Sequence, residues 1–136
     1  MLRRSKYKLV IANCQIKKKR MVLPNNIEDL WIIMGNNIRS SLNKTTLLEK
    51  ANELRRCHII NCEKIECVVE LDSSSSSLSC LVLNKLELLE LKILHRLCEL
   101  VRVEGVVIPP HIFSNLKQLD MWHCSRMRKL LPLELL

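Results

Sequence analysis

Residues 86–100 have the sequence LELLELKILHRLCEL. The apolar positions of this stretch, at intervals of 3, 2, 3, 3 and 3, are Leu86, Leu89, Leu91, Leu94, Leu97 and Leu100. The same intervals recur in residues 54–68, LRRCHIINCEKIECV, and in residues 116–130, LKQLDMWHCSRMRKL. Neither the 3.6-residue period of a helix nor the two-residue period of a strand accounts for this spacing alone. The chain is therefore predicted to consist of repeated structural units.

This spacing resembles that of leucine-rich repeats, in which a short strand turns into an irregular or helical return. We number the positions of each repeat from its first apolar residue. The copies start at Ile27, Leu54, Leu86 and Leu116, and a faint partial copy spans residues 9–14. The ninth position, which favours Asn or Cys in such repeats, holds cysteine in the second and the fourth copy. At least about three units must stack before such an array becomes stable, because each unit alone has open faces.

The predicted fold is an α/β solenoid, a leucine-rich-repeat horseshoe fragment with a short-stranded parallel sheet on its concave face and irregular or helical returns. Residues 1–22 form a basic segment with the degenerate partial copy, and residues 23–136 form the repeat domain, with a Ser-rich loop at residues 72–79. The expected strands are Lys8–Ile11, Leu30–Ile33, Cys57–Ile60, Leu89–Lys92 and Leu119–Trp122. Apolar residues at helical spacing over residues 43–54 predict a short helix on the convex side.

Alternation along each strand points the fourth and sixth positions into the core and the fifth and seventh outward, toward solvent. The outward positions form the candidate partner-binding face, which comprises Trp31, Ile33, His58, Ile60, Glu90, Lys92, Asp120 and Trp122. Five strands about 4.8 Å apart carry a ridge of roughly 20 Å, a scale that suits a peptide or a protein. Tryptophan is enriched among interface hot spots, and both tryptophans lie on this face. The alternative is that Trp31 and Trp122 pack under a flanking loop.

Composition disfavours several function classes. Only two glycines occur, so the chain has no glycine-rich phosphate loop, and nucleotide binding is not expected. The histidine and serine motifs of metalloproteases and hydrolases are absent, and we expect neither an enzyme nor a cofactor. The sequence shows no run of about 18 apolar residues and no secretory signal. The expected compartment is therefore the cytoplasm or the nucleus, without a membrane partner.

Positive charge is concentrated at the start of the chain. The first twenty residues contain eight Lys or Arg residues and no acid, whereas the rest of the chain balances 14 basic against 14 acidic residues. The run Lys17–Arg20 could be a nuclear-localisation or nucleic-acid patch, and residues 3–20 define the alternative of a nucleic-acid-associated fragment. A solvated loop is the favoured interpretation, because short basic runs occur by chance and aromatic residues for base stacking are scarce.

The chain has seven cysteines. Without a secretion signal, reduced thiols are expected rather than disulfides. A zinc alternative would use Cys57, His58, Cys62 and Cys67, which lie within eleven residues. It is disfavoured because no C-x-x-C pair occurs, and because the repeat places Cys57 and Cys62 in the core with His58 pointing away. We expect no metal site.

Four stretches carry a resemblance to a known family. They are CEKIEC at residues 62–67, LVRVEG at residues 100–105, FSNLK through LLPLELL at residues 113–136, and LPNNIEDL at residues 23–30. Together they resemble the C-terminal leucine-rich-repeat region of plant coiled-coil, nucleotide-binding, leucine-rich-repeat disease-resistance proteins. The resemblance covers roughly residues 23–136. It implies a protein-recognition module of an intracellular immune receptor, which senses a pathogen effector or a host protein altered by one.

The chain also departs from that family, because it contains no P-loop, no further ATPase motif and no coiled coil. The resemblance therefore implies a fragment without the nucleotide-binding switch, and no nucleotide site is carried over. Its implied partners are the sensed protein and the other domains of a full-length receptor. A further alternative is a non-functional truncated remnant, because repeat arrays need polar caps and residues 130–136 are almost entirely apolar.

Overall fold

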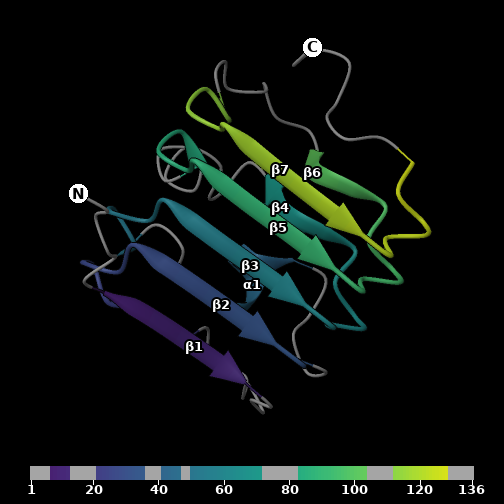
Figure 1. Ribbon diagram of the computed structural model, residues 1–136, viewed down its shortest axis with the longest axis horizontal. Helices are drawn as coiled ribbons and strands as arrows, with labels where there is room; N and C mark the ends of the chain where they lie inside the picture. Colours follow the sequence, from purple (N-terminus) through teal and green to yellow (C-terminus); the bar gives the residue numbers. More distant parts are fainter. Residues whose placement is uncertain are drawn as a thin grey trace.

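The computed structural model describes residues 7–12, 21–35, 41–46, 50–71, 83–103 and 112–128. Its elements are β1 (Lys8–Ala12), β2 (Asp29–Ile33), α1 (Leu42–Thr45), β3 (Arg56–Ile60), β4 (Cys67–Leu71), β5 (Leu88–Lys92), β6 (Glu99–Val103) and β7 (Gln118–Trp122). Five strands form a parallel sheet in the order β1-β2-β3-β5-β7, and β4 and β6 form a second, two-stranded parallel sheet. Figure 1 shows the smaller sheet and α1 behind the larger sheet.

The five strands of the larger sheet are those that the apolar spacing predicts, each one residue longer than expected. Their pairing has no offset, since equivalent repeat positions face each other in every neighbouring pair. The fifth positions of four successive strands, which pair in this way, are Trp31, His58, Glu90 and Asp120. The predicted parallel sheet is thus confirmed. We call each of these five strands, with the turns that flank it, a rung.

The fourth and sixth positions of the rungs point into a shared core, as predicted. In β2, β3 and β5 these residues are at most 1% exposed: Leu30, Ile32, Cys57, Ile59, Leu89 and Leu91. One buried cluster joins them to residues of β4 and β6, so the core fills the space between the two sheets. In β7 the equivalent Leu119 is half-buried and Met121 is exposed, because no described strand covers the outer side of this rung.

The residue after each of four strands adopts the left-handed backbone conformation. These residues are Met34, Asn61, Ile93 and His123, with φ between 54° and 57°. The backbone N–H of each of the first three donates a hydrogen bond of 2.8 to 3.0 Å to the last strand residue of the next rung. The chain therefore leaves the sheet at the same position in these four rungs. Ile93 does so against the usual preference of a β-branched residue.

The ninth position lies two residues after the end of each strand, and its cysteines link neighbouring rungs. The thiol of Cys62 lies 3.5 Å from the carbonyl of Ile60 in its own rung and 3.9 Å from that of Ile32 in the preceding rung. The thiol of Cys124 lies 3.7 Å from the carbonyl of Trp122 in its own rung and 3.6 Å from that of Leu91 in the preceding rung. A cysteine suits this place because it is a small, mostly apolar side chain with a weak donor.

Two of the returns form strands, which the apolar spacing does not predict. The elements β4 and β6 lie where the repeat pattern predicts irregular or helical returns, so the prediction is wrong for these two. Their sequences, CVVEL and ELVRV, are rich in the β-branched residues that favour strands, and Val69 pairs with Val101. Arg102 holds the end of this sheet through ion pairs with Glu99 at 2.9 Å and with Glu66 at 3.5 Å.

The helix predicted over residues 43–54 is wrong in extent. The observed helix α1 covers only Leu42–Thr45, and Thr46 follows in an extended conformation (φ −123°, ψ 157°) that ends it. Asn43 ties α1 to β4, because its side chain donates to the carbonyl of Glu70 at 2.7 Å and accepts from the N–H of Glu70 at 3.0 Å. Within the described residues, α1 and β4 are thus joined as part of the layer behind the larger sheet.

Some predictions concern other parts of the chain. The basic run Lys17–Arg20, the Ser-rich loop at residues 72–79 and the apolar stretch at residues 130–136 lie outside the described residues. The nucleic-acid and remnant alternatives, which depend on such segments, stay hypotheses. Within the described ranges, no helix combines the length and the apolar character that crossing a bilayer requires.

Candidate functional site

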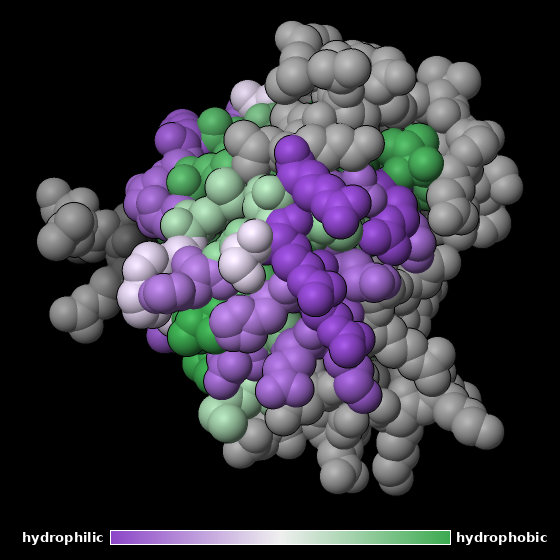
Figure 2. Space-filling view, turned by 90° about the vertical axis from the view of Figure 1, so that its right-hand side faces the viewer, coloured by the Kyte–Doolittle hydropathy of each residue, from purple (hydrophilic) through white to green (hydrophobic). Residues whose placement is uncertain are grey.

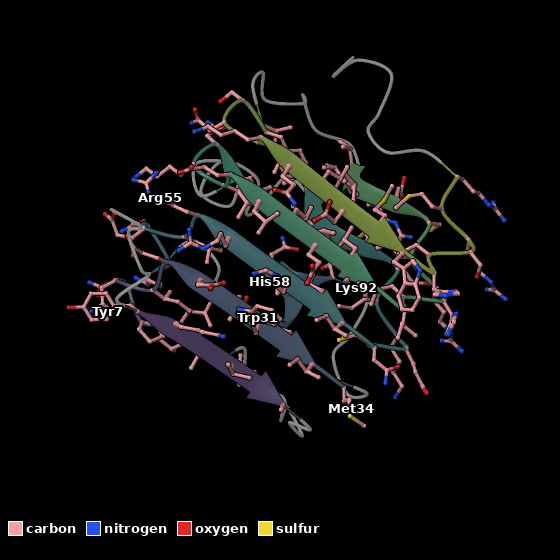
Figure 3. All side chains as sticks on the ribbon, in the orientation of Figure 1. Tyr7, Trp31, Met34, Arg55, His58 and Lys92 are labelled. Carbon is pink, nitrogen blue, oxygen red and sulfur yellow. The ribbon has the colours of Figure 1, made fainter. Side chains whose placement is uncertain are left out.

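Three rows of side chains cross the face of the larger sheet that points away from the core. They come from the third, fifth and seventh positions of the rungs, and we call this surface the sheet face. The predicted residues fill two of the rows, Trp31, His58, Glu90 and Asp120 in one and Ile33, Ile60, Lys92 and Trp122 in the other. The structure thus brings all eight to one face. Figure 3 labels Trp31, His58 and Lys92 on it.

Trp31 and His58 form the centre of the sheet face. Their rings are stacked, with centroids 3.7 Å apart and planes at 13°. The Nζ atom of Lys8 lies 4.6 Å from the centroid of the Trp31 ring, in a cation–π contact. Lys8 belongs to β1, Trp31 to β2 and His58 to β3, so three neighbouring strands contribute to one continuous stack.

His58 is buried, at 5% exposure, whereas alternation along β3 predicts an exposed side chain. The reason is that Trp31 stacks against its ring and carboxylates flank both of its nitrogens. The Nδ1 atom lies 3.1 Å from Oε1 of Glu90, and the Nε2 atom lies 3.1 Å from Oδ1 of Asp29.

Three buried polar atoms at this centre have no hydrogen-bonding partner. They are Nε1 of Trp31, Oδ1 of Asp29 and Nε2 of His58. The last two lie within ion-pair distance of each other, but they are not aligned for a hydrogen bond. Buried polar atoms are almost always hydrogen-bonded. The centre of the sheet face therefore keeps hydrogen-bonding capacity that the described residues do not use.

Besides Lys8, two charged residues of the sheet face are absent from the predicted set. Asp29 and Arg56 occupy the third position of adjacent rungs, and Nε of Arg56 lies 3.7 Å from Oδ2 of Asp29. The sequence does contain a signal for them, because alternation places the third position on the same side as the fifth. Counting two residues back from Trp31 and His58 identifies both.

Toward β7 the sheet face becomes polar and open. The second carboxylate oxygen of Glu90 lies 3.5 Å from Nζ of Lys92, and Gln118 donates to Asp120 at 2.7 Å. Trp122 is 57% exposed, so it does not pack under a flanking loop. The two tryptophans of the sheet face thus differ, one held inside a stack and the other open to solvent.

Charges on the sheet face compensate one another locally. Its carboxylates and cations are Asp29, Glu90, Asp120, Lys8, Arg56 and Lys92, with His58 between two of the carboxylates. Mixed, paired charges suit a partner with both polar and charged side chains, since complementary potentials set specificity and register. On this face, the described strands carry no hydroxyl or thiol beside His58.

The cysteines of the zinc alternative lie in the core. Burial raises the pKa of the Cys57 thiol and of the Cys67 thiol to about 12, and it also raises the pKa of Cys62. Such thiols stay protonated, whereas a metal ligand must be a thiolate. Cys57 and His58 point to opposite faces of β3, so the structure does not bring the four residues together. In the described ranges, no group of three or more His, Cys, Asp or Glu side chains is placed to hold a metal ion.

No protein-family model matches the chain, and neither a curated protein nor a solved structure is significantly similar to it. Function is therefore proposed from the geometry of the sheet face and from the sequence resemblance.

Proposed function

We propose that the chain is a leucine-rich-repeat solenoid fragment that recognises a partner protein through its sheet face. The solenoid interpretation is supported by the way in which sequence and local structure coincide. In successive rungs the same repeat positions lie on a strand, the residue after the strand has the left-handed conformation, and the ninth position is buried or half-buried. Rungs that repeat in this way are the building blocks of a stacked array.

The stack of Lys8, Trp31 and His58 is the observation that carries the recognition proposal. It combines an aromatic surface with a cationic end, and tryptophan is enriched among interface hot spots. Trp122 provides a second, exposed aromatic anchor on the same face. The strands that carry Trp31 and Trp122 are three spacings apart, or about 14 Å, so one protein surface can contact both.

The sequence resemblance supports the biological role. In this proposal the partner is a pathogen effector, or a host protein altered by one, and recognition contributes to a plant defence response. The chain acts in the cytoplasm or the nucleus, without a cofactor and without chemistry of its own. The other domains of a full-length receptor would hold the switch that recognition releases.

A site-specific photo-cross-linker tests the sheet face. We place p-benzoylphenylalanine at Trp122 or, as a matched control, at Val22, which is 67% exposed and lies outside the sheet face. The proposal expects a plant protein that cross-links from position 122 and not from position 22. When that protein is purified, Trp122→Ala should weaken its binding at least tenfold, and Val22→Ala should leave binding unchanged.

The opposite results would contradict the sheet face as the binding surface. They are equal cross-linking from both positions, or full binding by a Trp31→Ala/Trp122→Ala variant that unfolds as cooperatively as the parent chain.

A further inference from the structure

A groove lies beyond the ends of the strands, where the chain turns away from the larger sheet. Three successive rungs contribute their tenth and eleventh positions to it. These residues are Glu63, Lys64, His95, Arg96, Ser125 and Arg126, and they line a groove of about 450 Å³, which we call the turn groove. All six are exposed. Figure 2 views this side of the molecule, and a column of strongly hydrophilic side chains runs down it.

The eleventh positions align three cations. Lys64, Arg96 and Arg126 are separated by the repeat lengths of 32 and 30 residues, so they follow β3, β5 and β7 at the same place in each rung. With strands about 4.8 Å apart, the row spans about 10 Å. Like charges at this spacing repel one another, and a bound anion would relieve that repulsion.

None of these three cations forms an ion pair with another residue of the described ranges. Other basic side chains do form such pairs: Arg55 and Lys117 with Glu87, Arg56 with Asp29, Lys92 with Glu90, and Arg102 with Glu99. Glu63 is the one carboxylate among the residues that line the turn groove. The groove therefore has a net positive charge.

We propose that the turn groove binds an acidic segment of a partner protein, with carboxylates paired to Lys64, Arg96 and Arg126. Guanidinium groups bind carboxylates through two parallel hydrogen bonds, and two of the three cations are arginines. Residues one turn apart on a helix lie about 5 to 6 Å from each other, which is close to the spacing of the rungs. A helix with Glu at positions i, i+4 and i+8 therefore matches the row of cations.

The lining favours a protein over a nucleic acid as the ligand. It includes no Trp, Tyr or Phe on which bases could stack. The turn groove lies beyond the strand ends and shares no residue with the sheet face. It is therefore a second binding surface, independent of the one proposed for the sheet face.

Fluorescence anisotropy with the full chain tests this proposal. One probe is a fluorescein-labelled helical peptide with Glu at i, i+4 and i+8, and the other is a labelled single-stranded oligothymidylate of equal charge. The groove variant is Lys64→Ala/Arg96→Ala/Arg126→Ala. The matched control, Lys50→Ala/Lys85→Ala/Lys117→Ala, removes the same charge from exposed residues outside the turn groove.

We expect the groove variant to weaken peptide binding at least tenfold and the control variant to weaken it less than twofold. The salt dependence of binding should decrease only in the groove variant, because it loses the ion pairs. Equal losses in both variants, no peptide binding at low salt, or groove-dependent binding of the oligothymidylate in preference to the peptide would overturn the proposal. If the triple groove variant unfolds without cooperativity, the single changes Arg96→Glu and Lys85→Glu are compared by the same criteria.

Discussion

The indole of Trp31 lies parallel to the imidazole of His58, with ring centroids 3.7 Å apart, and the pair joins β2 to β3 at the fifth position of neighbouring rungs. This distance is shorter than the strand spacing of about 4.8 Å, so the two rings lean toward each other. The contact withdraws His58 from solvent and holds it between Asp29 and Glu90. The stack is therefore both the centre of the proposed recognition surface and a link between two rungs.

We expect Trp31 and His58 to be energetically coupled. A double-mutant cycle of Trp31→Ala and His58→Ala should give a coupling free energy of about 0.5 to 1.5 kcal/mol, measured by urea unfolding. His58→Ala alone should cost about 1 to 3 kcal/mol, because it leaves the carboxylates of Asp29 and Glu90 without their common partner. Val10→Ala, an exposed change on the same face, is the control. A coupling free energy below about 0.3 kcal/mol would contradict a stabilising stack.

The left-handed corners predict opposite effects of two substitutions at the same position of neighbouring rungs. Ile93 has φ 57° and Asn61 has φ 55°, yet only Asn tolerates this conformation well. Ile93→Asn should raise the free energy of unfolding by up to about 1 kcal/mol, and Asn61→Ile should lower it by about 1 kcal/mol. Equilibrium unfolding in urea measures both. Shifts of the same sign would mean that backbone strain does not dominate at this corner.

The ion pairs of Glu87 with Arg55 and Lys117 should make the fold less stable in acid. A hydrogen bond from Arg55 holds the pKa of its carboxyl below the ordinary value of 4.5, and the charge of Lys117 lowers that pKa further. The pKa of Glu87 is lower in the folded chain than in the unfolded chain. The stabilisation that ionised Glu87 provides is therefore present above about pH 4.5, and it is lost as the pH falls through the pKa of the folded chain. Glu87→Gln should cost at most about 1 kcal/mol at neutral pH, because the side chains of Arg55 and Glu87 are 43% and 32% exposed and solvent screens the pair.

The measurement is the free energy of unfolding of both proteins between neutral pH and about pH 3, with exposed Glu53→Gln as the control. The stabilities of the parent chain and of Glu87→Gln should converge in acid, and a constant difference down to that pH would contradict this role.

The buried thiols predict slow chemical modification. Burial raises the pKa of the Cys57 thiol from 9.0 to about 12, because the core disfavours the thiolate. The protonated thiol therefore contributes fully to the stability of the fold below pH 9, and this contribution is lost as the pH rises toward 12. At pH 8, maleimide should label Cys57 and Cys67 at least about 100-fold more slowly in the folded chain than in urea. Peptide mapping by mass spectrometry measures each site, and half-buried Cys98 is the internal reference. Labelling of Cys57 as fast as of Cys98 would contradict its place in the core.

The apolar intervals predict the larger sheet well because they report which residues face the core. They give the five strands, the inward fourth and sixth positions and the shared sheet face. They do not predict the smaller sheet, because apolar residues at the twelfth and fifteenth positions fit a helix, a strand or an irregular return equally well. The β-branched composition of β4 and β6 is the local signal that distinguishes these.

Exposure within the candidate site is harder to predict than position. Alternation is a local property, and it correctly assigns Trp31, His58 and Trp122 to one face. The burial of His58 instead depends on Trp31 and Glu90, which are 27 and 32 residues away along the chain. The helical spacing over residues 43–54 fails for a similar reason, since hydrogen bonds from α1 to β4 and an extended Thr46 determine the local structure there.

The copies of the repeat start 27, 32 and 30 residues apart, and yet their strands pair without any shift. All of the length variation between copies is consequently absorbed after the left-handed corner, outside the five strand residues of each rung, of which the third, fifth and seventh positions form the sheet face. Insertions and deletions on the far side of the molecule can therefore accumulate without moving any of the side chains of the sheet face.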